Sequence, residues 1–370
     1  MVSAIKKMDK KFKVTCLLII GLPLFILLFL AIIQGCKGGA SYEKYEEEMV
    51  AAAEKYFKQE NLIPGSEGQI ETVDLSTLVN KKLIKSTEKY LDDLSCMGSV
   101  SVIRNGESLE ENNGGFLNYT YELKCDEYST PLLVNKLKED LTTSGDGLYA
   151  DGNGFIYKGY KVDNYIRFYG SMYRIMSIDE NNNLKLIKIE PERNSRIWDN
   201  KYNIDVNYSS GKNIYKDSKI LEYLIKDYNN VKKFSGDAKK SIVAHDVCVG
   251  KRSTANLELS NTAECSEVLE KQLIGLLELT DFAKASLDEN CNSIKAKSCK
   301  NYNYLKGTVS SSWTVNAVLD NTYEAYALLD GIAYAQTTNE YNNYNVVIYI
   351  SGNEVFTSGK GTLSEPYVIE

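Results

Sequence analysis

The sequence predicts an α+β protein: an N-terminal transmembrane helix, a small helix-plus-antiparallel-sheet domain, then a mixed α/β domain rich in short antiparallel strands. Three observations support this fold class. Residues 14–36 carry no charge, a helical repeat begins at Ser41, and short aromatic or β-branched runs alternate with turns after residue 150. Apolar residues at helical spacing predict amphipathic helices, and short runs bounded by turns predict strands.

The apolar segment Val14–Ile33 is long enough to cross a membrane. Twenty helical residues at about 1.5 Å each reach about 30 Å, the thickness of the hydrocarbon layer. Five lysines lie in the first 13 residues, and only Lys37 follows the segment closely. Because lysines favour the cytoplasmic side, we expect a cytoplasmic tail at 1–13, a signal anchor at 14–34 and a single-pass protein of the cell membrane whose C-terminal bulk is extracytoplasmic.

A second interpretation of the same segment is a lipid anchor. Ile33–Cys36 resembles a bacterial lipobox, in which cleavage before a cysteine is followed by lipidation, here of Cys36. Gln34 is unusual in that position, and the apolar run exceeds the 7–15 residues of a typical signal peptide. Both interpretations place residues 37–370 outside the cytoplasm.

Composition excludes some classes of partner and cofactor. The net charge is −7, and it is −11 once the five lysines and Asp9 of the first 13 residues are set apart. Because phosphate binding needs a basic face, we expect no nucleic-acid partner. His245 is the single histidine and lies in a strand-like segment. We expect no metal or other cofactor.

The cysteines beyond the anchor form three sequential pairs. Outside the cytoplasm, an even number of cysteines predicts disulfides, whereas a zinc site would need C-x-x-C spacing or several histidines. Nearest-neighbour pairing requires only segments that already adjoin. It gives three bonds, Cys96–Cys125, Cys248–Cys265 and Cys291–Cys299.

A first outer domain is predicted at residues 40–130. Apolar residues at helical spacing over 42–57 predict an amphipathic helix, and Asp74 or Ser76 is suited to cap a second, shorter helix. Two strands should follow, Val100–Arg104 and Tyr119–Lys124. This region resembles the head of a pilin or pseudopilin. The resemblance rests on the helices, on a small sheet closed by Cys96–Cys125 and on the segment Thr72–Ile84. Assembling pilins carry a glutamate early in the apolar segment, and Val14–Ile33 has none.

The second outer domain is predicted at residues 151–370, after a linker at 131–150 that ends in glycine-rich turns. Two helices are expected, at Ser218–Tyr228 and Ala263–Leu277. The remaining patterns predict a meander of strands. These strands are expected at Phe155–Lys158, Asn164–Phe168, Met172–Ile178, Leu184–Ile189, Ser311–Val318, Tyr323–Leu328 and Val346–Ile350.

An ordered series of sequence blocks in this domain resembles an uncharacterised domain of anchored surface proteins of Gram-positive bacteria. The blocks include Ile156–Gly159, Asn164–Phe168, Tyr173–Ile178, Ile197–Asp199, Ile274–Leu277, Cys291 with Cys299, Ser312–Thr314, Val347–Ile350 and Gly359–Ile369. The resemblance implies a C-type-lectin-like fold, related to that of formylglycine-generating enzymes. Relatives have tryptophan where this chain has Tyr173, and Arg-Pro where it has Asn345 and Val346.

No set of residues with catalytic spacing accompanies this resemblance. Glu190 and Trp198 only loosely imitate the calcium triplets of lectins, which must supply oxygens from several segments. Tyrosines interleaved with asparagines could stack on sugars and hydrogen-bond their hydroxyls. We therefore expect a non-catalytic binding or scaffold protein whose ligand is a cell-wall or host glycan, or another surface protein. The candidate ligand-binding residues are Tyr302, Tyr304, Trp313, Tyr341 and Tyr344.

Two other functions are consistent with the sequence. A pilus-like or secretion accessory component would use exposed contacts on the helix over 42–57. A formylglycine-type oxidase would need free thiols at Cys291 and Cys299 to hold its metal.

Overall fold

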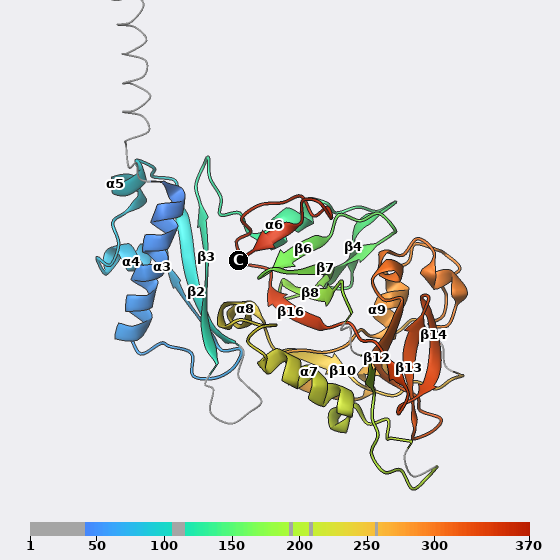
Figure 1. Cartoon of the computed structure of the whole chain (residues 1–370). Coiled ribbons are helices and arrows are strands. Elements are labelled where there is room, and N and C mark those ends of the chain that lie inside the picture. The colour runs from blue at the N-terminus through green and yellow to red at the C-terminus, as the bar shows by residue number, and fades with distance from the viewer. Residues whose placement is uncertain (1–40, 106–114, 192–194, 207–209, 256–257) are drawn as a thin grey trace, which may run out of the picture.

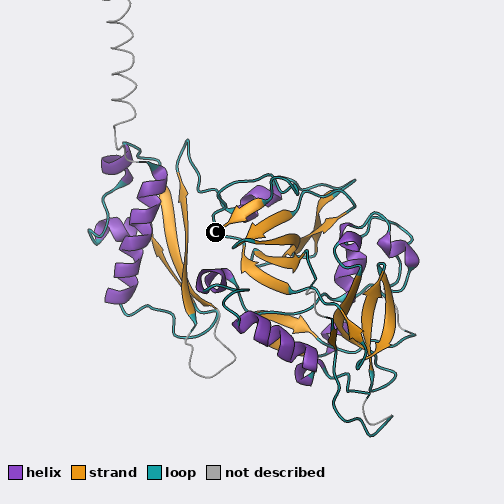
Figure 2. Ribbon diagram, viewed as in Figure 1, coloured by secondary structure: helices purple, strands orange, loops and turns teal. Residues whose placement is uncertain are grey.

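The computed structural model describes residues 41–105, 115–191, 195–206, 210–255 and 258–370. The anchor predicted at 14–34 and the lipidation site predicted at Cys36 lie outside these residues. Within the described ranges, no helix has the length and apolar character needed to cross a membrane. The described chain is a mixed α+β protein with mostly antiparallel sheets, as the sequence predicts (Figure 2).

The N-terminal module, residues 41–130, is a helix packed on a three-stranded antiparallel sheet of order β1-β2-β3. Its apolar core forms where alternate residues of the strands meet one stripe of the long helix. Figure 1 shows this helix on one side of the sheet and the rest of the protein on the other. The elements are α3 (Tyr42–Gln59), β1 (Ile70–Asp74), α4 (Leu75–Asn80), α5 (Thr87–Leu91), β2 (Met97–Asn105) and β3 (Phe116–Lys124).

The amphipathic helix and both strands predicted for this module are confirmed. Ser41 caps α3, because its hydroxyl accepts a hydrogen bond from the Lys44 amide at 3.2 Å. Met49 and Phe57 are buried on the helix face that meets Val100 and Val102 of β2. Strand β1 and helix α5 were not predicted from the sequence.

The C-terminal module, residues 131–370, is built on a seven-stranded sheet. Strands β16-β8-β7-β5-β4 form its main path, and β6 joins β7 to β17. Only the β6–β17 pairing is parallel. The strands are β4 (Gly147–Asp151), β5 (Gly154–Lys158), β6 (Tyr165–Phe168), β7 (Ser171–Ile178), β8 (Asn183–Lys188), β16 (Val347–Ser351) and β17 (Tyr367–Ile369).

Smaller sheets and short helices complete this module. The sheets pair β12-β13-β14, β10 with β11, and β9 with β15. The first helix predicted for this module is confirmed as α7, and the Ser218 hydroxyl caps it by accepting from the Leu221 amide. The elements are α6 (Leu133–Lys138), β9 (Arg196–Ile197), α7 (Lys219–Asn229), α8 (Gly236–Ser241), β10 (His245–Cys248), β11 (Val268–Gln272), α9 (Leu279–Lys284), β12 (Ser311–Ala317), β13 (Glu324–Leu329), β14 (Ile332–Thr337) and β15 (Tyr341–Asn342).

Two predictions about this module are wrong. The helix predicted at Ala263–Leu277 is instead a short turn followed by strand β11, because the bond from Cys265 to Cys248 draws this segment into a hairpin with β10. The linker predicted at 131–150 contains α6 and β4. Its apolar side chains, Leu133 and Leu148 among them, are buried in the core of the C-terminal module.

The three disulfides are those that the sequence predicts, Cys96–Cys125, Cys248–Cys265 and Cys291–Cys299. Each closes a local loop, and none joins the two modules. The first closes the N-terminal sheet between β2 and β3, and the others hold irregular segments of the C-terminal module. The pairing also removes the two thiols that the oxidase alternative requires.

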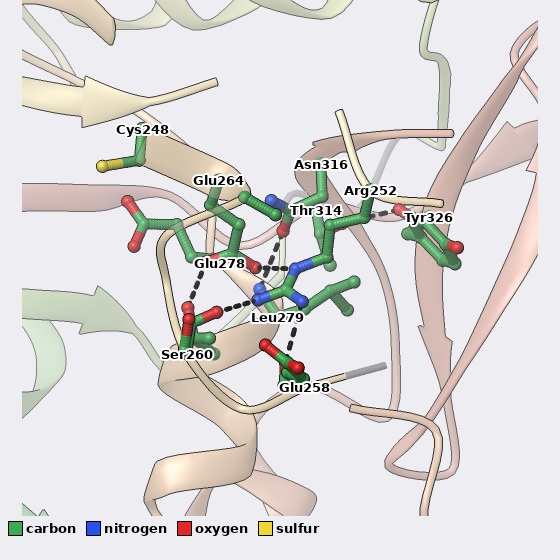
Figure 3. Close-up of polar contacts among 12 residues, drawn as sticks. Cys248, Arg252, Glu258, Ser260, Glu264, Glu278, Leu279, Thr314, Asn316 and Tyr326 are labelled. Carbon is green, nitrogen blue, oxygen red and sulfur yellow. Dashed lines mark hydrogen bonds and ion pairs between the residues drawn. The ribbon is translucent and has the colours of Figure 1, made fainter. Parts of the chain in front are cut away.

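A buried ion pair organises the segment around α9 (Figure 3). Arg252 donates to the carboxylate of Glu264 at 2.7 Å, and both side chains are at most 1% exposed. The guanidinium also donates to the carbonyls of Glu258 and Ser260. Glu264 in turn accepts from the hydroxyl of Thr280 in α9. The first turn of α9 is thus connected through Thr280 to the buried ion pair.

Candidate functional site

The five predicted ligand-binding residues do not form a shared surface. Tyr302 and Tyr341 are 64% and 72% exposed, but Tyr304, Trp313 and Tyr344 are at most 3% exposed. The Trp313 indole donates to the carbonyl of Arg196 at 2.8 Å, and the Tyr344 hydroxyl donates to Asp227 at 2.8 Å. These three side chains fill the core, so they cannot stack on a sugar. The tyrosine-lined site predicted at 301–345 is wrong.

Two adjoining polar concavities lie elsewhere, one between the two modules and one on the C-terminal module. The first, here named the inter-module cleft, has a volume of about 460 Å³. It is lined by Gly68, Ile70, Ser101, Ile103, Asn105, Thr120, Asn181, Asn183, Val243, Ala244, Ser351 and Asn353.

The N-terminal wall of the inter-module cleft follows from strand periodicity. Successive side chains of a strand point to opposite faces. Val100 and Val102 of β2 are buried under α3, so Ser101, Ile103 and Asn105 face the other module. Hydrogen bonds between the modules hold this wall opposite the C-terminal module. The Asn105 amide donates to the carbonyl of Lys240 at 2.7 Å, and that of Asn118 donates to Glu354 at 2.8 Å.

The opposite wall is the turn between β7 and β8. The carboxylate of Asp179 accepts hydrogen bonds from the backbone amides of Asn181 and Asn183 at 2.8 Å, which closes the turn. Asn182 adopts a left-handed conformation with φ 64°, which asparagine tolerates well. The side chains of Asn181 and Asn353 are exposed and, within the described part of the chain, make no hydrogen bond. They are available to a ligand.

A second concavity of about 680 Å³ continues from the first, since the two share Asn181, Asn183 and Ala244. Its lining adds acidic side chains, including Glu180 and Asp246. The combined surface offers amides, hydroxyls and carboxylates, with exposed apolar carbon at Ile70. Such a surface matches a polar ligand that hydrogen-bonds through many hydroxyl or amide groups.

His245 lies beside this surface but is not suited to acid–base chemistry near neutral pH. Its ring stacks on Tyr349 with the centroids 3.5 Å apart. Burial, together with the nearby Lys185 ammonium, lowers the pKa of His245 to about 3. The imidazole is therefore neutral under ordinary conditions, in keeping with the structural role that the sequence predicts for it.

This depressed pKa predicts a loss of stability in acid. The ordinary pKa of 6.5 applies to the unfolded chain, so below that value the unfolded state binds a proton that the folded state excludes. The stability contributed by the neutral ring is complete above pH 6.5 and is lost as the pH falls toward 3. In the acid range, the free energy of unfolding should therefore depend less steeply on pH in His245→Phe, which keeps the stacking, than in the wild type. We expect the difference in slope to be up to about 1.4 kcal/mol per pH unit. Urea unfolding between pH 6 and 4 measures this, and equal slopes in variant and wild type would contradict it.

Metal ligands are scarce at this surface. Within the described ranges, a single group of three potential ligands comes together, Asp93 with Cys96 and Cys125, and both cysteines are in a disulfide. The triplet that begins at Glu190 extends beyond the described residues. In the one that begins at Trp198, the indole is fully buried and Asp199 accepts backbone hydrogen bonds from Lys201 and Lys212.

Comparisons with known proteins identify no relative. No family model matches the chain, and neither the curated proteins nor the solved structures show a significant match. The lectin-like and pilin-like resemblances stay predictions.

The strands predicted at Met172–Ile178 and Leu184–Ile189 imply a turn between them but not the place of that turn in a site. The cleft depends on how two modules pack, and no local motif encodes that packing. One feature of the sequence does point to the cleft. Polar and β-branched residues alternate along β2, which indicates a strand with one buried face and one polar face.

Proposed function

We propose that this chain is a membrane-anchored, extracytoplasmic binding protein that is not an enzyme, and that the inter-module cleft binds a glycan. The observation that carries the proposal is the paired wall of amide and hydroxyl side chains, with Asn181 and Asn353 exposed on one side and the polar face of β2 on the other. Sugars are recognised by such directional hydrogen bonds together with apolar patches, which Ile70 and Ile103 supply.

Anchoring is supported by the sequence of residues 14–34 and by the lysines before it. We expect protease added to intact protoplasts to digest residues 41–370 and to spare the basic tail. Full protection of the chain would contradict this topology. A lipid mass on Cys36, sensitive to a signal-peptidase inhibitor, would decide for the lipobox over the signal anchor; both keep the module pair outside.

Glycan binding is tested with a glycan array, followed by titration of any sugar that binds. If Asn181 and Asn353 each donate one hydrogen bond worth about 1 kcal/mol, the double change Asn181→Ala/Asn353→Ala weakens binding about 30-fold. A chelator should leave binding intact, because the cleft offers no calcium cage.

The matched control is Tyr341→Ala, which removes an exposed ring outside the cleft. It should leave the affinity unchanged. A folded protein that binds no glycan on the array, or a double variant with wild-type affinity, would overturn the proposal. Binding of a purified surface protein to the same cleft would support the scaffold function in its place.

A further inference from the structure

A lysine and two carboxylates meet in the interior of the C-terminal module, apart from the inter-module cleft. Lys185 extends from β8, and its Nζ lies 2.6 Å from Oδ2 of Asp281 and 3.5 Å from Oε2 of Glu278. These side chains are 6%, 17% and 13% exposed. Lys185 and Asp281 are 96 residues apart in the sequence. A lysine this deeply buried is uncommon in a folded protein.

Aromatic rings enclose this cluster. The Lys185 ammonium lies 5.6 Å from the centre of the Tyr349 ring, which His245 covers on one face. Tyr215 and Tyr304 are buried, and within the described residues their hydroxyls have no hydrogen-bond partner. Beside Lys185, Glu278 and Tyr349 lies a cavity of about 10 Å³, close to the space that one water molecule needs. The cluster is thus largely shielded from bulk solvent.

The carboxylates are fixed by the start of α9. Glu278 and Asp281 occupy the two acidic positions of a capping box, and the Glu278 amide donates to Oδ2 of Asp281 at 3.3 Å. The Leu279 amide donates a hydrogen bond to Oδ1 of Asn316 at 2.8 Å, and the Thr280 hydroxyl donates to the carboxylate of Glu264. Asp281 therefore cannot swing away from Lys185. Well-oriented groups of one molecule can reach effective concentrations of about 10⁵–10⁸ M.

Electrostatics provides a group that can carry protons. Burial is the main cause that raises the pKa of Glu278 to about 7, despite the opposing Lys185 charge. The two carboxylates outweigh burial at Lys185 and keep its pKa well above the ordinary value, so the resting state is an ion pair. Transfer of one ammonium proton to Glu278 gives the neutral amine. The ion pair stays the predominant state, and the low-dielectric interior reduces the cost of this transfer because it removes two buried charges.

We propose that Lys185 and Asp281 condense into an intramolecular amide bond, with Glu278 relaying the protons. The neutral Nζ attacks Cγ of Asp281, and a C–N bond forms. Glu278, which carries the first ammonium proton, donates it to a carboxylate oxygen of Asp281 as the C–N bond forms. It then takes the second proton from Nζ and delivers it to the same oxygen, which leaves as water when the C–O bond breaks. The ammonium and carboxylate supply all atoms of the water, Glu278 returns to its starting state, and no oxidation occurs. The product locks β8 to α9.

Peptide mass mapping of the full-length chain, exported so that its disulfides form and then reduced before digestion, tests this bond. Trypsin should fail to cut after Lys185 and should release residues 175–188 joined to residues 272–284, lighter than the two peptides together by one water molecule. Cleavage after Lys185 without any joined peptide would overturn the proposal.

Two comparisons separate the reaction from a structural ion pair. Glu278→Gln should retain the three disulfides and the circular dichroism of the wild type but lose the joined peptide. The exposed pair Lys284–Asp151, whose atoms are 2.9 Å apart, is an internal control and should stay uncoupled. A joined peptide of equal abundance in folded Glu278→Gln would overturn the proton relay. Coupling of Lys284 to Asp151 would mark the bond as an artefact of handling.

Discussion

Replacing Arg252 with methionine is expected to lower the free energy of unfolding of the C-terminal module by about 3–5 kcal/mol. The guanidinium is 1% exposed and makes three hydrogen bonds, to the Glu264 carboxylate and to the carbonyls of Glu258 and Ser260. Burial already raises the pKa of Glu264 against the opposing effect of Arg252. Without its partner, this carboxylate would be buried uncompensated. Both tryptophans lie in this module, so urea unfolding followed by tryptophan fluorescence reports on it.

The matched control removes both charges together. Arg252→Met/Glu264→Leu leaves no unpaired ion, and replacement of a buried pair by apolar residues is often close to neutral. We expect the double variant to be clearly more stable than Arg252→Met alone. If the single and the double variant are equally destabilised, the loss comes from packing and not from the ion pair.

Trp198→Ala is expected to lower the free energy of unfolding by about 3–5 kcal/mol, because it leaves a cavity in a close-packed core. The ring is fully buried, and its Nε1 donates to the carbonyl of Thr314 at 3.1 Å. The resulting cavity would lie between the β12 sheet and α7, because the ring donates to Thr314 of β12 and the backbone carbonyl of residue 198 accepts from the Ile220 amide of α7. Thermal unfolding by circular dichroism measures the effect.

Tyr302→Ala serves as the control for this change. It also removes an aromatic ring, but one that is 64% exposed. Surface substitutions of this kind usually change stability by less than about 0.5 kcal/mol. Equal losses in the two variants would show that the core around Trp198 is loosely packed.

Local patterns in the sequence predicted much of the fold. Helix α3 follows from apolar spacing and the Ser41 cap, and strands such as β7 and β16 follow from short β-branched runs. The disulfides follow from proximity in sequence. The segment 263–277 was wrongly predicted as helical because its leucines also suit a helix, and only the Cys248–Cys265 bond and the pairing with β10 decide against it. Tertiary contacts overrode local propensity there.

The candidate site was much less predictable than the fold. Tyrosine density between 301 and 345 indicated a binding surface, but composition does not say which rings face the solvent. Tyr304 and Tyr344 are core residues, whereas Asn181 and Asn353, far apart in sequence, meet at one cleft. The pairing of β8 with β16 brings these two residues together, and contacts between the modules place β2 opposite them. Neither arrangement leaves a local pattern in the sequence. The buried Lys185 likewise resembles any surface lysine until its neighbours are known.

The parallel pairing of β6 with β17 has a consequence for folding order. Residues 166–168 find their sheet partners only at 367–369, and β8 finds β16 only at 347–351. Contacts of such long sequence separation slow folding, because a large loop must close before they form. A chain that crosses a membrane from its N-terminus would therefore emerge with β6 and β8 unpaired along one edge until the last strands arrive. During that interval the short-range disulfides, which need no distant partner, can already restrain the segments between them.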